Sequence, residues 1–158
     1  MQKLNLPAYP FRLKNELGKQ FIFDSIRKKY VVLTPEEWVR QHFIQYLVQE
    51  KKYPEALMAV EKKILLNGQP RRFDLLVYQR NGQPLLIAEF KAPRVKITQD
   101  AFDQVVRYNM ALRVLHVVVS NGMQHFACEM NNTENSFTYL KEIPQFCDRC
   151  RTDGQGFS

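Results

Sequence analysis

The chain has no long apolar run and few cysteines. None of its apolar stretches approaches the roughly 20 residues that a membrane-spanning helix needs, so we expect no membrane partner. The first residues, MQKLNLPAYPF, lack the apolar core of a signal peptide, and we therefore expect a cytoplasmic protein. Three cysteines are an odd number in a chain without an export signal, which argues against a disulfide framework.

The cysteines allow two interpretations. His125 and Cys128, followed by Cys147 and Cys150, have the spacing of zinc ligands. However, His125 and Cys128 fall in a predicted strand, where residues three apart point to opposite faces. This favours free thiols, with Cys128 buried and the other two cysteines in a loose tail, over a structural zinc site.

The composition fits one globular domain with an excess of basic residues. Of 158 residues, 45% are hydrophobic and 25% are charged, and the formal net charge is +7. Residues 1–33 hold seven basic and two acidic side chains, a net charge of +5. Such an arm suits a polyanionic partner, although it equally suits a solvated segment that aids solubility.

The order of predicted elements is helix, three strands, helix, two strands. We expect residues 1–33 to form a basic arm with one or two short strands packed on a core domain at 34–144, and 145–158 to form a disordered tail. Thr34-Pro35 starts the first helix and Thr98 caps the second. The predicted elements are helices over 34–50 and 98–112, strands over 58–66, 114–120 and 124–130, and a two-stranded hairpin within 71–93 whose second strand Pro93 ends, in a mixed α/β sandwich.

The stretch 71–93 is the most informative part of the chain. Two apolar runs joined by Asn81-Gly82 predict a β-hairpin with a tight primed turn. Asp74 interrupts the first run, and Glu89 and Lys91 stand at the end of the second. Because unpartnered charges are costly in apolar strands, the pattern D-x14-E-x-K needs a physical cause.

A divalent cation supplies such a cause. Glu89 and Lys91 are two residues apart, so their side chains leave the strand on one face, and Asp74 faces them if the register agrees. The two carboxylates and a backbone carbonyl, that of Phe90, suit Mg²⁺ or Mn²⁺, which would be completed by waters and substrate phosphate oxygens. Lys91 would then orient or help deprotonate an attacking water.

These residues resemble the PD-(D/E)XK nuclease superfamily, and within it the N-terminal domain of type I restriction enzyme R subunits. The resemblance implies a restriction-endonuclease-like αβββαβ core, metal binding by Asp74 and Glu89, and a catalytic role for Lys91. An acidic residue of the first helix joins the metal site in many relatives, and helix phase favours Glu36 over Glu37, because Glu36 lies on the predicted core-facing side. The resemblance is carried by residues 27–30, 34–40, 72–74 and 89–93.

Further matches extend the expected site to the substrate. Gln104 and Tyr108 are similar to the Q-x3-Y motif of several nuclease branches, and Arg40 and Arg72 lie within the motifs above, so all four are expected to contact substrate. Phe73 stands where the superfamily pattern has proline, which is not a ligand. A simpler interpretation remains for Tyr108, that of a core tyrosine beside a surface glutamine.

Three functions follow for comparison. The first is a metal-dependent nuclease that hydrolyses DNA phosphodiester bonds in restriction, repair or defence, alone, as a homodimer or in a larger restriction complex. The second is a non-catalytic module that binds nucleic acid or docks a partner. The third is a protein in which the hairpin charges form structural ion pairs. The choice between DNA and RNA, and between endonuclease and exonuclease action, stays open.

Overall fold

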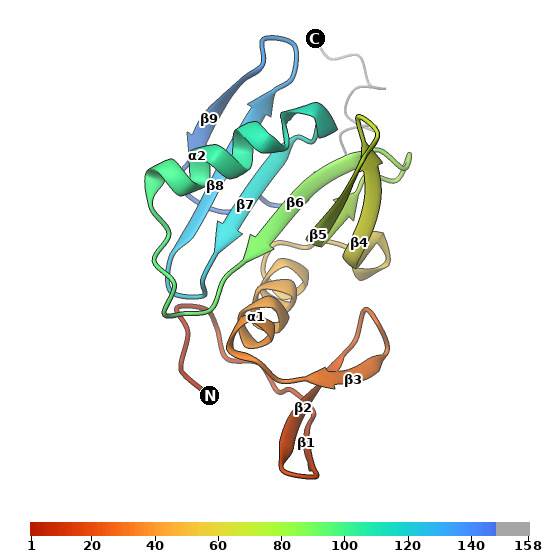
Figure 1. Cartoon of the computed structure of the whole chain (residues 1–158), viewed down its shortest axis with the longest axis vertical. Coiled ribbons are helices and arrows are strands. Elements are labelled where there is room, and N and C mark those ends of the chain that lie inside the picture. Colours follow the sequence, from red (N-terminus) through yellow and green to blue (C-terminus); the bar gives the residue numbers. More distant parts are fainter. Residues whose placement is uncertain (148–158) are drawn as a thin grey trace.

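The computed structural model describes residues 1–147 and places a mixed six-stranded sheet between two α-helices (Figure 1). The strand order is β4-β5-β6-β7-β8-β9, with β6 and β7 parallel and the other neighbours antiparallel. The predicted mixed α/β fold with an αβββαβ core is therefore present. Its elements are α1 (Pro35–Gln49), β4 (Met58–Leu66), β5 (Gln69–Tyr78), β6 (Pro84–Phe90), α2 (Gln99–Tyr108), β7 (His116–Ser120), β8 (His125–Asn131) and β9 (Ser136–Leu140).

Helix α1 begins and ends as predicted. The Thr34 hydroxyl accepts the Glu37 N–H at 3.0 Å, and Pro35 occupies the first turn, where a missing N–H costs nothing. One face of the helix buries Phe43 completely, and its ring lies 5.4 Å from that of Phe90 in β6. This packing places α1 beside the end of β6.

Helix α2 covers the opposite face of the sheet (Figure 1). The Thr98 hydroxyl caps it by accepting the Ala101 N–H at 3.1 Å, and Phe102 and Val106 are fully buried against strand residues such as Val117. The parallel neighbours β6 and β7 are joined by a crossover through α2. Short 3-10 turns complete the described helices, at Glu55–Leu57 and Met110–Leu112.

The hairpin turns differ from one another. Asn67 and Gly68 both have positive φ, as a two-residue primed turn requires. The same turn predicted at Asn81-Gly82 is wrong. Only Gly82 has positive φ there, its N–H bonds to Gln79 O, and Gln79 N–H bonds to Gln83 O, which makes a three-residue loop. Next to this loop the register of β5 and β6 shifts between Val77 and Tyr78.

The N-terminal arm forms a small sheet of its own beside α1 (Figure 1). It has three antiparallel strands, one more than expected: β1 (Leu13–Glu16), β2 (Lys19–Asp24) and β3 (Lys29–Val32). Ahead of it, Leu4 is buried, and the Asn5 N–H bonds to Gly122 O at 2.8 Å. The arm is thus anchored to the core at both ends.

The remaining expectations concern strand β9, the cysteines and the tail. Strand β9 was not predicted. Cys128 is fully buried, burial raises the pKa of its thiol to about 12, and Cys147 is exposed. The Phe146 N–H bonds to Lys51 O at 2.9 Å, beyond the expected domain end at 144, whereas Cys150 and the rest of the expected tail lie outside the described residues. No helix in the described chain is long and apolar enough to cross a membrane.

Candidate functional site

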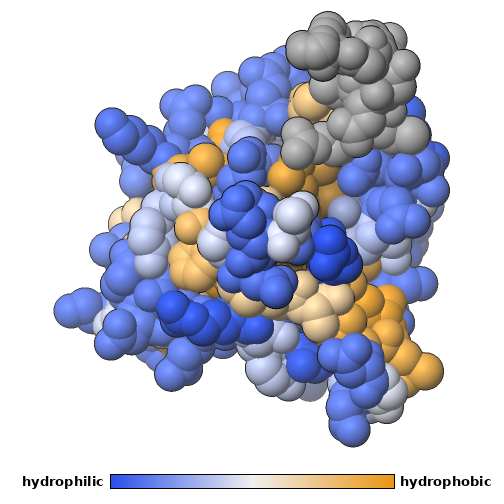
Figure 2. Space-filling model, turned by 90° about the horizontal axis from the view of Figure 1, so that it is seen from above, coloured by the Kyte–Doolittle hydropathy of each residue, from blue (hydrophilic) through white to orange (hydrophobic). Residues whose placement is uncertain are grey.

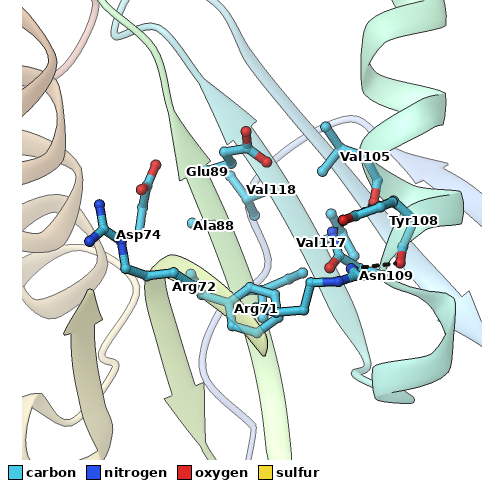
Figure 3. Close-up of a pocket in the computed structure, with 12 residues that line it drawn as sticks. Arg71, Arg72, Asp74, Ala88, Glu89, Val105, Tyr108, Asn109, Val117 and Val118 are labelled. Atoms are coloured by element: carbon cyan, nitrogen blue, oxygen red, sulfur yellow. Dashed lines mark hydrogen bonds between the residues drawn. The ribbon is translucent and has the colours of Figure 1, made fainter. Parts of the chain in front are cut away.

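Asp74 and Glu89 lie side by side on the central hairpin. The register pairs Leu75 with Ala88, the neighbours of Asp74 and Glu89 in sequence, and the charge of Glu89 acts on Asp74. Figure 3 draws both side chains near the end of β6, with Asp74 to the left of the strand and Glu89 to its right. The Phe90 N–H donates to Asp74 Oδ2 at 2.8 Å, which fixes the aspartate against the end of β6.

The environment of Asp74 disfavours its negative charge. Burial is the largest effect and raises the pKa of the carboxyl, and the nearby charges of Glu89 and Glu61 raise it further. The hydrogen bond from Phe90 and the charge of Arg40 act in the opposite direction without cancelling the shift. The protonated form of Asp74 is therefore favoured more than that of a carboxyl in water.

Lys91 stands next to this acidic pair. Its ammonium lies 3.2 Å from Glu89 Oε1, and both side chains are about 40% exposed, at 42% and 39%. The Lys91 backbone N–H bonds to Ser120 O at 2.9 Å, so the residue extends the pairing of β6 with β7. The three residues of the D-x14-E-x-K pattern are thus brought together, with Lys91 open to solvent and able to reorient.

Glu36 reaches the same cluster from α1, but not from the core-facing side that was expected. Glu36 is exposed, and Glu37 is the buried residue of the pair. Desolvation and the negative charge of Asp74 raise the pKa of Glu36, whereas Lys91 and Arg40 act to lower it. Glu36 thus lies within electrostatic range of Asp74 and Lys91.

Glu37 is occupied by a buried ion-pair network. Its carboxylate accepts hydrogen bonds from Arg40 at 2.7 Å, from Arg27 at 3.0 Å and from Gln41 at 2.7 Å. Burial alone would raise the pKa of Glu37, but hydrogen bonds and charge from Arg40 hold it below its ordinary value. In a capping box the Glu37 carboxylate would bond back to the N–H of Thr34, the N-cap residue. Here the carboxylate contacts Arg27 and Arg40.

Arg40, which was expected to bind substrate, has a buried side chain held in an ion-pair network. Its side chain is 7% exposed and bridges Glu37 to Glu61, 3.0 Å away. It also donates to the backbone oxygen of Asp74 at 3.4 Å, and its Nη1 lies 3.9 Å from Asp74 Oδ1. The guanidinium therefore ties α1 to β4 through Glu61 and to β5 through Asp74.

Glu61 was missed by sequence reasoning. It lies on β4 with φ of +58°, a conformation that is uncommon for a residue with a side chain, and it also pairs with Arg72 at 2.9 Å. The surrounding letters, VEKK, are typical of a solvated strand and contain no signal for this contact. Arg72 itself remains 60% exposed, as a substrate-binding residue requires.

A pocket of about 210 Å³ opens beside the acidic pair, between β5, β6, β7 and the end of α2. Tyr108 and Arg72 line it, together with Asp74 and Glu89, whereas the exposed Gln104 does not. Tyr108 is 64% exposed, which excludes a core tyrosine. The guanidinium carbon of Arg71 lies 3.4 Å from the Tyr108 ring centre, and Arg71 bonds to Tyr108 O at 3.1 Å (Figure 3).

The donor set suits a hard cation that keeps much of its water. Among the residues the structure describes, no three His, Cys, Asp or Glu side chains converge closely enough to form a metal centre by themselves. Magnesium takes one or two protein carboxylates and completes its shell with water and phosphate oxygens. Asp74 and Glu89, two carboxylates beside an open pocket, fit that chemistry and do not fit a closed structural zinc site.

Fold and site together describe an α/β domain in which Asp74 on β5 and Glu89 on β6 line one pocket. A family profile described as "Type I restriction enzyme R protein N terminus (HSDR_N)" matches residues 35–144, from α1 to beyond β9, and the chain belongs to this family. No curated protein matches the chain. The match includes Asp74, Glu89 and Lys91 and leaves out the N-terminal sheet.

Proposed function

We propose that the protein is a metal-dependent nuclease of a restriction system and that it retains the PD-(D/E)XK chemistry. The main support for this proposal is that Asp74 and Glu89 lie on two paired strands beside an open pocket, with Lys91 next to Glu89. Membership of the R protein N-terminal family supports the restriction context. Hydrolysis of DNA is the reaction that this set of groups serves best.

Each residue has a separate task in this proposal. Asp74 and Glu89, with the Phe90 carbonyl and with Glu36 from α1, would hold Mg²⁺ or Mn²⁺, which supplies Lewis-acid stabilisation of the phosphate. Lys91 lies beside Glu89 and is exposed enough to orient the attacking water and to stabilise charge on phosphorus. Arg40 keeps Asp74 in place through the ion-pair network.

Basic side chains around the hairpin supply the contacts to DNA. Lys62 and Lys63 are exposed on β4, and Arg71 and Arg72 follow on the paired strand β5. These four residues lie on the paired strands β4 and β5, and β5 also carries Asp74. Arg71 and Arg72 line the pocket, so phosphates bound to them would lie in it. Tyr108 offers a ring at its far side.

A non-catalytic binding module is the second candidate. One observation favours it: within residues 1–147, no third acidic side chain completes a compact metal centre with Asp74 and Glu89. A surface that only binds DNA would gain by losing these two carboxylates, because they repel phosphate. The presence of both carboxylates therefore favours the nuclease over the binding module.

Two measurements test the nuclease proposal. Calorimetric titration with Mg²⁺ and with Mn²⁺ should give binding at millimolar concentration for the wild type and none for Asp74→Asn, and wild-type protein that binds neither ion would favour the binding module. A cleavage panel of linear, nicked, branched and single-stranded DNA should give metal-dependent products that Lys91→Ala does not form. Failure of the wild type on every substrate would overturn the proposal.

A further inference from the structure

A second groove lies away from the hairpin, between the N-terminal arm and α1. It encloses about 490 Å³, and none of its lining residues lines the hairpin pocket. Three of those residues are aromatic: Tyr9 and Phe11 from the segment before β1, and Phe23 from β2. Arg12 completes this wall, with its guanidinium carbon 3.9 Å from the centre of the Phe23 ring.

The facing wall is a row of amides. Gln41, Gln45 and Gln49 are spaced four residues apart on α1, so their side chains lie along one side of the helix. Each amide carries both donors and acceptors. Gln41 spends one donor on Glu37, and Gln49 donates to Gln45 at a long 3.5 Å, which leaves capacity for a ligand.

The Tyr9 hydroxyl adds a polar group that lacks a partner. Its oxygen is buried and makes no hydrogen bond within the described residues. Burying a hydroxyl without a partner costs free energy, so a ligand that bonds to it would gain affinity. Glu50 is the single acidic residue among those that line the groove.

The aromatic wall continues onto the outer face of the N-terminal sheet. Phe23 pairs with Tyr30 across β2 and β3, and their ring centres are 5.3 Å apart. Lys14 on β1 places its ammonium 4.5 Å from the Tyr30 ring centre. Half-exposed rings and cations thus alternate along this face, in the segment that carries most of the net positive charge.

We propose that this groove and the adjoining sheet face bind single-stranded nucleic acid. Bases would stack on Phe11 and Phe23, their edges would bond to the glutamine amides and Tyr9, and phosphates would contact Arg12 and Lys14. In a duplex, neighbouring bases cover the faces of each base, so an aromatic side chain cannot stack on them. The inference concerns binding alone and does not depend on cleavage at the hairpin.

Fluorescence anisotropy with a labelled oligothymidylate strand tests the proposal on the full chain. EDTA is present throughout, so the hairpin site contributes no metal-dependent binding. The wild type should bind the strand more tightly than a duplex of equal length, and Phe23→Leu should weaken strand binding about tenfold, because stacking is worth roughly 1–3 kcal/mol per base. Arg12→Gln should reduce the salt slope by about 0.7.

Matched variants elsewhere control for general effects. Phe137 on β9 is also half-buried, with a ring neighbour at 5.5 Å and an arginine at 5.8 Å, so Phe137→Leu repeats the chemical change and should bind as the wild type does. Lys141→Gln repeats the charge loss of Arg12→Gln at another exposed position. Thermal unfolding establishes that each variant is folded.

Photocrosslinking with a bromouracil-substituted strand tests the wild type directly, so the result stands even if Phe23→Leu does not fold. Crosslinks at Tyr9, Phe11 or Phe23 support the proposal. Crosslinks confined to other elements would overturn it. Equal binding by wild type and Phe23→Leu would also overturn it and would assign the groove to a protein segment or a second copy of the chain.

Discussion

Replacement of Arg40 by methionine should destabilise the protein by about 3 kcal/mol. Methionine keeps the apolar length of the side chain and removes the guanidinium, which is 7% exposed and paired with Glu37 and Glu61. Removing one partner of a buried ion pair costs roughly 3–5 kcal/mol. We expect the lower end, because Arg27 and Gln41 still contact Glu37. The free energy of unfolding in urea measures the loss.

Arg72→Met is the matched control. Arg72 pairs with the same Glu61, at 2.9 Å, but its side chain is 60% exposed, and exposed pairs contribute about 1 kcal/mol or less. Because the folded-state pKa of Glu37 is lowered, its stabilisation is present above the unfolded pKa and is lost as pH falls through the folded value. The difference between wild type and Arg40→Met should therefore shrink in acid. A loss below 1 kcal/mol at neutral pH would refute the structural role of Arg40.

Three further predictions address the site, the arm and the DNA contacts. Asp74→Asn should stabilise the metal-free protein at neutral pH. The folded-state pKa of Asp74 is raised, so the stability that its protonated form contributes is lost as pH rises through that pKa, and asparagine removes the destabilising charge. An unchanged urea midpoint would contradict this. Gly122→Ala should lower stability by roughly 2 kcal/mol and more than Gly82→Ala, since both have positive φ but only at Gly122 would a Cβ lie 2.8 Å from a neighbouring side chain, as thermal unfolding can check. The double change Lys62→Gln, Lys63→Gln should reduce the salt slope of duplex binding by about 1.8, and an unchanged slope would place the DNA elsewhere.

The helices and most strands could be predicted because their signals are local. Thr34-Pro35 and Thr98 mark helix starts within a few residues, and apolar runs bounded by turns mark the strands. Strand β9 escaped because Ser136–Leu140 is short, mixed in polarity and largely exposed, so it buries no face that a pattern could reveal. The additional strand of the arm, β1, has four residues that are all exposed.

The candidate site could be predicted in part for a similar reason. A hairpin brings Asp74 near Glu89 by pairing the adjacent residues Leu75 and Ala88, and the two-residue spacing places Lys91 beside Glu89. The fate of Glu37 depends on Arg27, which arrives from the separate N-terminal sheet. Glu61 likewise acquires its contacts through an unusual backbone angle and through arginines on other elements. Such long-range partners leave no trace in the local pattern.

Metal-dependent cleavage by Lys91→Ala beside Lys96→Ala tests the central claim most directly. Both changes remove one ammonium from the segment that follows β6, but Lys91 lies 3.2 Å from Glu89, whereas Lys96 is an exposed residue further along the loop. With Mg²⁺ or Mn²⁺ and the DNA form that the wild type cuts best, Lys96→Ala should cleave at close to the wild-type rate. Lys91→Ala should lose cleavage by a factor of about 100 or more while its DNA affinity changes little. Equal rates for the two variants would contradict a catalytic site on the central hairpin.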